Sequence, residues 1–258
     1  MVKRVLNLPR INAKTVISVL NGWFFVKKDK EVGVMSDISM KLAVLETMYK
    51  IHDRILASYD LACAEGCSVC CTRNVSVTSL EAFFMLDNLD PDKRDNALAR
   101  IQGQMDKKRL IPAITINRMA DLCMNGYDLP EEECDPAWGA CPLLEDGRCT
   151  VYSVRPFGCR CMVSSENCGL SGLADMDEFL VTVNNVFMQY LEHIDQGSTS
   201  ANISDMLLAL SDPHALSAYR ITGLFEINTP GFLSNQPISI LMVPPEYRER
   251  INDILSEL

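Results

Sequence analysis

The sequence predicts a mainly α-helical protein with a small β-hairpin and a cysteine-rich loop region around a metal or cluster site. Apolar residues recur at helical spacing in several stretches, which is the main signal for amphipathic helices. Two β-prone runs within residues 15–27 flank Asn21-Gly22, a pair that favours the type I′ turn of a hairpin. Residues 126–172 are rich in glycine, proline and cysteine, so we expect irregular loops there.

The predicted helices follow one another along most of the chain. A long amphipathic pattern covers residues 37–63, with Cys63 at its C-terminal end and Gly66 as a natural stop. Thr78-Ser79-Leu80-Glu81 reads as a capping box that opens a helix to about residue 89. Pro91 suits the first turn of a helix to about residue 108. Further elements are expected as helices at 117–124, 174–194 and 203–220 (a pair) and after Pro244-Pro245, and as a short strand at 238–243.

Composition and charge limit the class of protein. The chain has 258 residues, of which 48% are hydrophobic, so it can bury a core without cross-links, and we expect a single domain over 1–258. A net charge of −10 argues against a nucleic-acid partner, because the phosphate backbone repels it. We find neither a secretory signal nor a membrane span, and therefore expect a cytoplasmic protein whose thiols stay reduced.

Four cysteines gather in the first cysteine segment, residues 63–71. Cys63, Cys67, Cys70 and Cys71 are close enough for several sulfurs to converge on one metal at little cost in loop closure. Thiolates suit zinc and iron–sulfur clusters equally well. The adjacent Cys70 and Cys71 are expected to point apart, serving two metals or leaving one spare. The alternative is a set of four buried structural cysteines.

The second cysteine segment, residues 141–168, spreads its cysteines through loops that can surround a metal from several sides. The 69 residues between the two segments read as helices, which can return the chain to its starting point. We therefore expect the two segments to meet in space. The eight thiolates match two four-ligand sites, or one cluster with cysteines in reserve. The cysteines of this second segment are Cys141, Cys149, Cys159 and Cys168.

These motifs resemble the bacterial and archaeal cysteine-cluster (CxxxCxxCC) family, described as a zinc- or iron-chelating domain. The first half is Cys-x3-Cys-x2-Cys-Cys followed by Ser-Val-Thr-x2-Glu. The second is Cys-Pro-x-Leu, then Gly-x-Cys-x2-Tyr-x2-Arg-Pro-x2-Cys-Arg and a last cysteine. The resemblance covers residues 60–170 and implies metal chelation there; flagellin lysine methylases carry a related cluster. It implies these ligands: Cys63, Cys67, Cys70, Cys71, Cys141, Cys149, Cys159 and Cys168. Cys123, Cys134 and Cys161 fall outside the pattern.

Two arginines, Arg155 and Arg160, flank Cys159 and are candidate cofactor-binding residues. A guanidinium near thiolates would offset their charge and donate hydrogen bonds to sulfur. The alternative is that they anchor the loop through nearby carbonyl groups. The three histidines stand alone on predicted helices and are expected to be packing or surface residues rather than ligands.

The predicted function is a metal-binding protein that coordinates an iron–sulfur cluster, with [4Fe–4S] as the expected type, or zinc. We favour the cluster, because the chain buries a core without a structural zinc and eight cysteines exceed one closed zinc site. The alternatives are an enzyme of protein-methylase or redox type that uses the metal site, and a structural zinc module that binds a protein partner. Cys63, Cys67 and Cys70 have radical-SAM spacing, but no alternating strand–helix pattern surrounds them.

Overall fold

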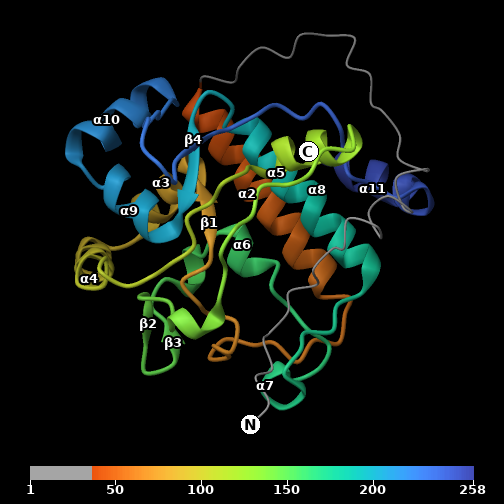
Figure 1. The fold of residues 1–258 in the computed structure, drawn as a ribbon, viewed down its shortest axis with the longest axis horizontal. Coiled ribbons are helices and arrows are strands. Elements are labelled where there is room, and N and C mark those ends of the chain that lie inside the picture. The colour runs from red at the N-terminus through yellow and green to blue at the C-terminus, as the bar shows by residue number, and fades with distance from the viewer. Residues whose placement is uncertain (1–36) are drawn as a thin grey trace.

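The computed structural model describes residues 37–258, which form a mainly helical fold with a small antiparallel sheet (Figure 1). The predicted fold class is therefore confirmed, while the hairpin predicted at 15–27 lies outside the described residues. The α-helices are α2 (Ile38–Leu56), α3 (Ser79–Asn88), α4 (Pro91–Gln102), α5 (Ile116–Met124), α6 (Phe157–Arg160), α7 (Cys168–Ser171), α8 (Glu178–Ile194), α9 (Ile203–Leu210), α10 (Pro213–Thr222) and α11 (Arg248–Leu255).

Short strands pair segments that lie far apart in the chain. The three-stranded sheet has the order β1-β4-β5, and both pairings are antiparallel. Strand β1 meets β4 with Val77 opposite Ala201. The second sheet is a hairpin of β2 and β3. The strands are β1 (Ser76–Thr78), β2 (Leu144–Glu145), β3 (Arg148–Cys149), β4 (Thr199–Asn202) and β5 (Leu233–Ser234), and 3-10 helices cover Pro136–Trp138, Tyr152–Val154 and Pro245–Tyr247.

The long helices α2 and α8 run side by side through the middle of the molecule (Figure 1). Leu45 and Met48 of α2 are fully buried and share one apolar cluster with Val183 and Phe187 of α8. Helix α2 ends at Leu56 rather than near residue 63 as predicted.

The capping box predicted at the start of α3 is present. The Thr78 hydroxyl accepts a hydrogen bond from the Glu81 backbone N–H, while the Glu81 carboxylate accepts one from the Thr78 N–H. This exchange satisfies two N–H groups that would otherwise lack partners at the helix start. Helix α3 packs against α9 and contributes to a second apolar cluster around Phe83 and Tyr219.

The strand predicted at 238–243 is not formed, although the segment is apolar. Gln189 of α8 takes the place of a neighbouring strand. Its side-chain amide donates to the carbonyl of Ile240 at 2.7 Å and accepts from the N–H of Met242 at 2.9 Å. Because a single side chain satisfies these backbone groups, Ile240, Leu241 and Val243 are buried without joining a sheet.

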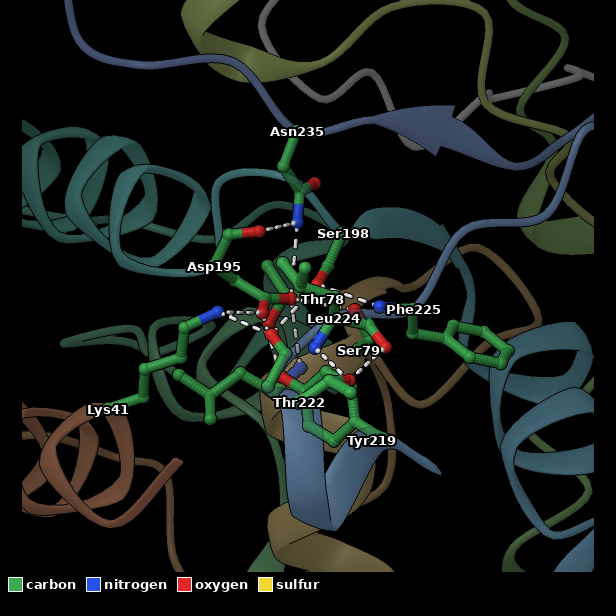
Figure 2. Close-up of polar contacts among 12 residues, drawn as sticks. Lys41, Thr78, Ser79, Asp195, Ser198, Tyr219, Thr222, Leu224, Phe225 and Asn235 are labelled. Carbon is green, nitrogen blue, oxygen red and sulfur yellow. Dashed lines mark hydrogen bonds and ion pairs between the residues drawn. The ribbon is translucent and has the colours of Figure 1, made fainter. Parts of the chain in front are cut away.

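A fully buried carboxylate, Asp195, holds several elements together at the end of α8 (Figure 2). Lys41 of α2 forms an ion pair with Asp195 at 3.3 Å and donates to the carbonyl of Gly223 at 2.7 Å. The Tyr219 hydroxyl donates to Oδ1 of Asp195 at 2.7 Å, and the Ser79 hydroxyl donates to Oδ2 at 2.7 Å. The network therefore ties α2, α3, α8 and α10 to one point.

Candidate metal centre

The first cysteine segment is a loop that turns away from the end of α2. The Ala62 N–H donates to the carbonyl of Ser164 at 2.9 Å, which draws the chain towards the second cysteine segment. Gly66 has φ of +97° and makes the turn between Cys63 and Cys67. Left-handed backbone of this kind suits glycine because it has no Cβ. Gly66 therefore shapes the cysteine loop and does not end a helix as predicted.

Backbone contacts join the second cysteine segment to the first. The Cys141 N–H donates to the carbonyl of Cys71 at 2.9 Å. Next to this bond, Thr72 and Ala140 form an antiparallel bridge. The expectation that the two segments meet in space is confirmed, and the residues between them return the chain as predicted.

The hairpin of β2 and β3 positions Cys149. Its turn is Asp146-Gly147, and both residues have positive φ, 47° and 76° respectively. This is the conformation of a type I′ turn, for which Asp-Gly is a favoured pair. The pairing places Cys149 opposite Leu144, three residues after Cys141.

The short helix α6 carries Cys159 and is anchored by a buried carboxylate. The N–H of Phe157, at the start of α6, donates to Oε1 of Glu81 at 2.7 Å. The Tyr49 hydroxyl donates to the same oxygen at 3.2 Å. Glu81 therefore has two roles, since the capping box of α3 also fixes the helix that bears Cys159.

Cysteines from both segments surround one cavity of about 470 Å³. Arg155 and Arg160 also line it. Cys168, the eighth predicted ligand, does not line the cavity, but Gly169 next to it lies against the side chain of Val69. Seven of the eight predicted ligands line the cavity, and they are Cys63, Cys67, Cys70, Cys71, Cys141, Cys149 and Cys159.

The thiols surround this cavity without closing on a single point. Among residues 37–258, no three side chains of His, Cys, Asp or Glu come close enough together to hold one metal ion. In a tetrahedral zinc site with Zn–S bonds of about 2.3 Å, the ligand sulfurs lie about 3.8 Å from one another. The arrangement of cysteines in the described part of the chain is wider than such a shell.

Cys70 and Cys71 interact directly, although adjacent side chains were predicted to point apart. A hydrogen bond from Cys71 lowers the pKa of the Cys70 thiol to about 6, and the same bond raises the pKa of Cys71. The cause is a tight turn, because the Thr72 N–H donates to the carbonyl of Cys70. Successive side chains oppose one another in an extended strand but not in such a turn. Both thiols therefore line the same cavity.

Burial keeps the inner thiols protonated. It raises the pKa of Cys141 to about 11. Burial also raises the pKa of Cys159 well above its usual value, and the nearby thiols of Cys141 and Cys149 add to this effect. Metals bind the thiolate rather than the thiol, so a cation that enters the cavity must displace these protons.

The two arginines predicted to bind a cofactor have different surroundings. The Arg155 guanidinium stacks on the Tyr152 ring at 3.7 Å, and its Nε is buried without a hydrogen-bond acceptor. Arg160 uses its donors within the protein, at the carbonyl of Arg155 (2.9 Å) and the carbonyl of Ser153 (3.1 Å). Arg155 therefore keeps one donor unused, whereas Arg160 anchors the loop.

Two further arginines near Cys141 were not predicted from the sequence. The charges of Arg73 and Arg100 both act to lower the pKa of the Cys141 thiol, although burial outweighs them. Arg100 donates to the carbonyls of Pro142 and Leu144 and so fixes the loop after Cys141. The position of Arg73, two residues after Cys71, was an available signal, whereas nothing in the sequence around Arg100 distinguishes it.

The three cysteines outside the family pattern also lie outside the cavity lining. Cys161 is 6% exposed and belongs to the apolar cluster around Phe157, where its thiol donates weakly to the carbonyl of Gly158. Cys123 lies on α5, and Cys134 is exposed in the loop that follows. All three serve as internal controls for experiments on the cavity.

Comparison of the chain with protein-family models, with curated proteins and with solved structures finds no match. No helix within residues 37–258 combines the length and the apolar character needed to cross a membrane.

Proposed function

We propose that this protein binds an iron–sulfur cluster, of the [4Fe–4S] type, in the cavity between its two cysteine segments. The observation that carries the proposal is that seven thiols from segments far apart in the sequence surround one cavity. Thiolates are the usual protein ligands of such clusters, and four are needed for each [4Fe–4S] centre. The proposed ligands come from the eight predicted cysteines, of which Cys168 alone does not line the cavity.

The cavity is chemically suited to a sulfur-rich anionic group. Arg155 lines it, and the buried Nε of this residue is a donor that no acceptor among the described residues satisfies. The charge of Arg155 acts on Cys70 and on Cys149, which come from different segments. Hydrogen bonds to sulfur and nearby charge tune bound clusters, so Arg155 is the residue we assign to that role. A bound cluster would supply one-electron chemistry at this position.

The setting of the centre agrees with this proposal. Cys67 and Cys70 are exposed, so the cavity is accessible from the surface to a protein partner or a substrate. We propose that the protein works in the cytoplasm, where cysteines remain reduced and free to bind metal. An enzyme of protein-methylase or redox type would use the same centre.

Metal and sulfide analysis of anaerobically purified protein tests the proposal. We expect iron and acid-labile sulfide in equal amounts, and a visible absorption band that bleaches on reduction. Cys71→Ser, Cys141→Ser and Cys159→Ser should each lose most of the iron. Cys123→Ser and Cys134→Ser are the matched controls and should retain it, because neither residue lines the cavity.

A colourless protein with stoichiometric zinc and no sulfide would contradict the cluster and would favour a structural zinc module. Equal iron loss in the control variants would show that the cysteines of the cavity have no special role.

A further inference from the structure

Arg73 is a buried cation without a carboxylate partner among residues 37–258. Its side chain is 9% exposed, and its Nη2 donates to the neutral amide of Gln104. The Nε of Arg73 is buried and has no acceptor. Lys41, by contrast, is buried against the carboxylate of Asp195. The charge of Arg73 is therefore not compensated by the part of the protein that the structure describes.

The backbone of Arg73 is fixed next to Cys71 and Thr72, which line the cysteine cavity. Its carbonyl accepts a hydrogen bond from the side chain of Asn202 at 2.8 Å. The preceding residue, Thr72, pairs with Ala140, and Cys141 follows directly. A Cβ placed on Gly139 would lie 3.5 Å from Nε of Arg73, so the guanidinium lies against the chain that leads into Cys141. Arg73 does not line the cavity and cannot be a ligand.

We propose that Arg73 compensates the negative charge of the bound centre and thereby raises its reduction potential. This inference rests on the proposed function, since it needs a cluster held by thiolates. An added electron makes such a centre more negative, and a nearby positive charge in a poorly solvated environment favours that state. Arg73 acts electrostatically, without direct contact with the centre. The positive charge of its guanidinium and the negative charge of the proposed cluster offset each other.

The test compares charge variants of the full-length protein, purified anaerobically, by iron and sulfide content and by spectroelectrochemical titration of the midpoint potential. Arg73→Gln should keep its iron and shift the midpoint potential to more negative values. Arg73→Lys keeps the charge and should return the potential towards that of the wild type. Arg220→Gln is the matched control, because Arg220 pairs with Asp87 away from the cavity and should leave the potential unchanged.

A second variant keeps the inference testable if Arg73→Gln fails to fold. Gln104→Glu leaves Arg73 in place but gives it a carboxylate partner, so it should also shift the potential to more negative values. Loaded protein in which neither Arg73→Gln nor Gln104→Glu changes the potential would overturn this inference alone. Wild-type protein without iron and sulfide would overturn the proposed function and this inference together.

Discussion

The network around Asp195 and the cysteine cavity each gather residues from distant parts of the chain, but they differ in what completes them. Asp195 is fully buried, and its two oxygens accept from Lys41, Tyr219 and Ser79. In the cavity, thiols face open space, and the guanidinium of Arg155 has a buried donor without an acceptor. The polar groups of the Asp195 network therefore have partners within the protein, whereas the cavity is lined by thiols and by an arginine with one unused donor.

Breaking the Asp195 network should have the largest effect. Lys41→Met leaves a carboxylate buried without its cation, and we expect a loss of about 3–5 kcal/mol in the free energy of unfolding. Urea denaturation followed by circular dichroism measures it. Lys50→Met is the control, because that lysine is exposed and pairs with Glu46 on the surface, where the expected change is below about 0.5 kcal/mol. Equal losses in the two variants would contradict the central role of Asp195.

Removing the proposed metal centre should loosen the cavity while leaving the Asp195 network intact. A ligand present at about 100 times its dissociation constant stabilises the folded state by about 2.7 kcal/mol, and the stripped protein loses this contribution. Hydrogen exchange should increase first in residues 60–72 and 141–172, with α2 and α8 protected for longer. Uniform exchange over both regions would show that the metal stabilises the whole fold rather than the cavity.

His52 of α2 is buried between α8 and α6 and should make stability depend on pH. Its Nε2 bonds to Asn184 of α8 at 2.9 Å, and its ring contacts Phe157 of α6 at 4.7 Å between centroids. Burial lowers the pKa of His52, so the unfolded chain binds a proton more readily than the folded one. This contribution is complete above about pH 6.5 and is lost as the pH falls towards the folded pKa, by at most about 1.4 kcal/mol per pH unit.

Unfolding measured between pH 5 and pH 8 checks the role of His52. His52→Gln should flatten this part of the profile, whereas His214→Gln, in an exposed histidine, should leave it unchanged. An identical profile for wild type and His52→Gln would assign the pH dependence to other groups.

The smallest expected effect concerns the hairpin turn at the cavity. Gly147→Ala places a Cβ at φ of +76°, and we expect a cost of about 1 kcal/mol. Gly103→Ala is the matched control, because its φ is −68° and alanine adopts that conformation without strain. Thermal unfolding measures both. Iron content is a second measurement. It should fall slightly in Gly147→Ala, because the hairpin carries Cys149.

Local signals in the sequence were sufficient to predict most of the helices. The capping box of Thr78 and Glu81 located the start of α3 because both of its hydrogen bonds lie within four residues. The end of α2 could not be predicted in this way. The apolar pattern continues to residue 59, but the chain leaves the helix to bond with Ser164, a contact across a hundred residues. The sheet of β1, β4 and β5 was also not predicted. Its strands are too short to show an alternating pattern, and they pair with segments far away in the chain.

The cysteines that line the cavity were predictable from the sequence, but the shape of the site was not. The cysteine motifs identified eight residues, of which seven line the cavity and one, Cys168, does not. The direct interaction of Cys70 with Cys71 depends on a turn that the two residue types do not encode. Arg73 and Arg100 were missed because their significance arises from burial and from neighbours supplied by distant segments.

The hydrogen bond between Cys71 and Cys141 also constrains the order of events during synthesis. The first cysteine segment is made well before the second, and the two meet only after the intervening 69 residues have emerged. Closing a loop of this length has an entropic cost that grows with the logarithm of its length, and the helices α3, α4 and α5 shorten the distance to be searched. A nascent chain therefore exposes Cys63, Cys67, Cys70 and Cys71 as an incomplete set, open to oxidation or to capture of a stray ion. The proposed cofactor would therefore find a complete set of cysteines only after the helical insert has folded.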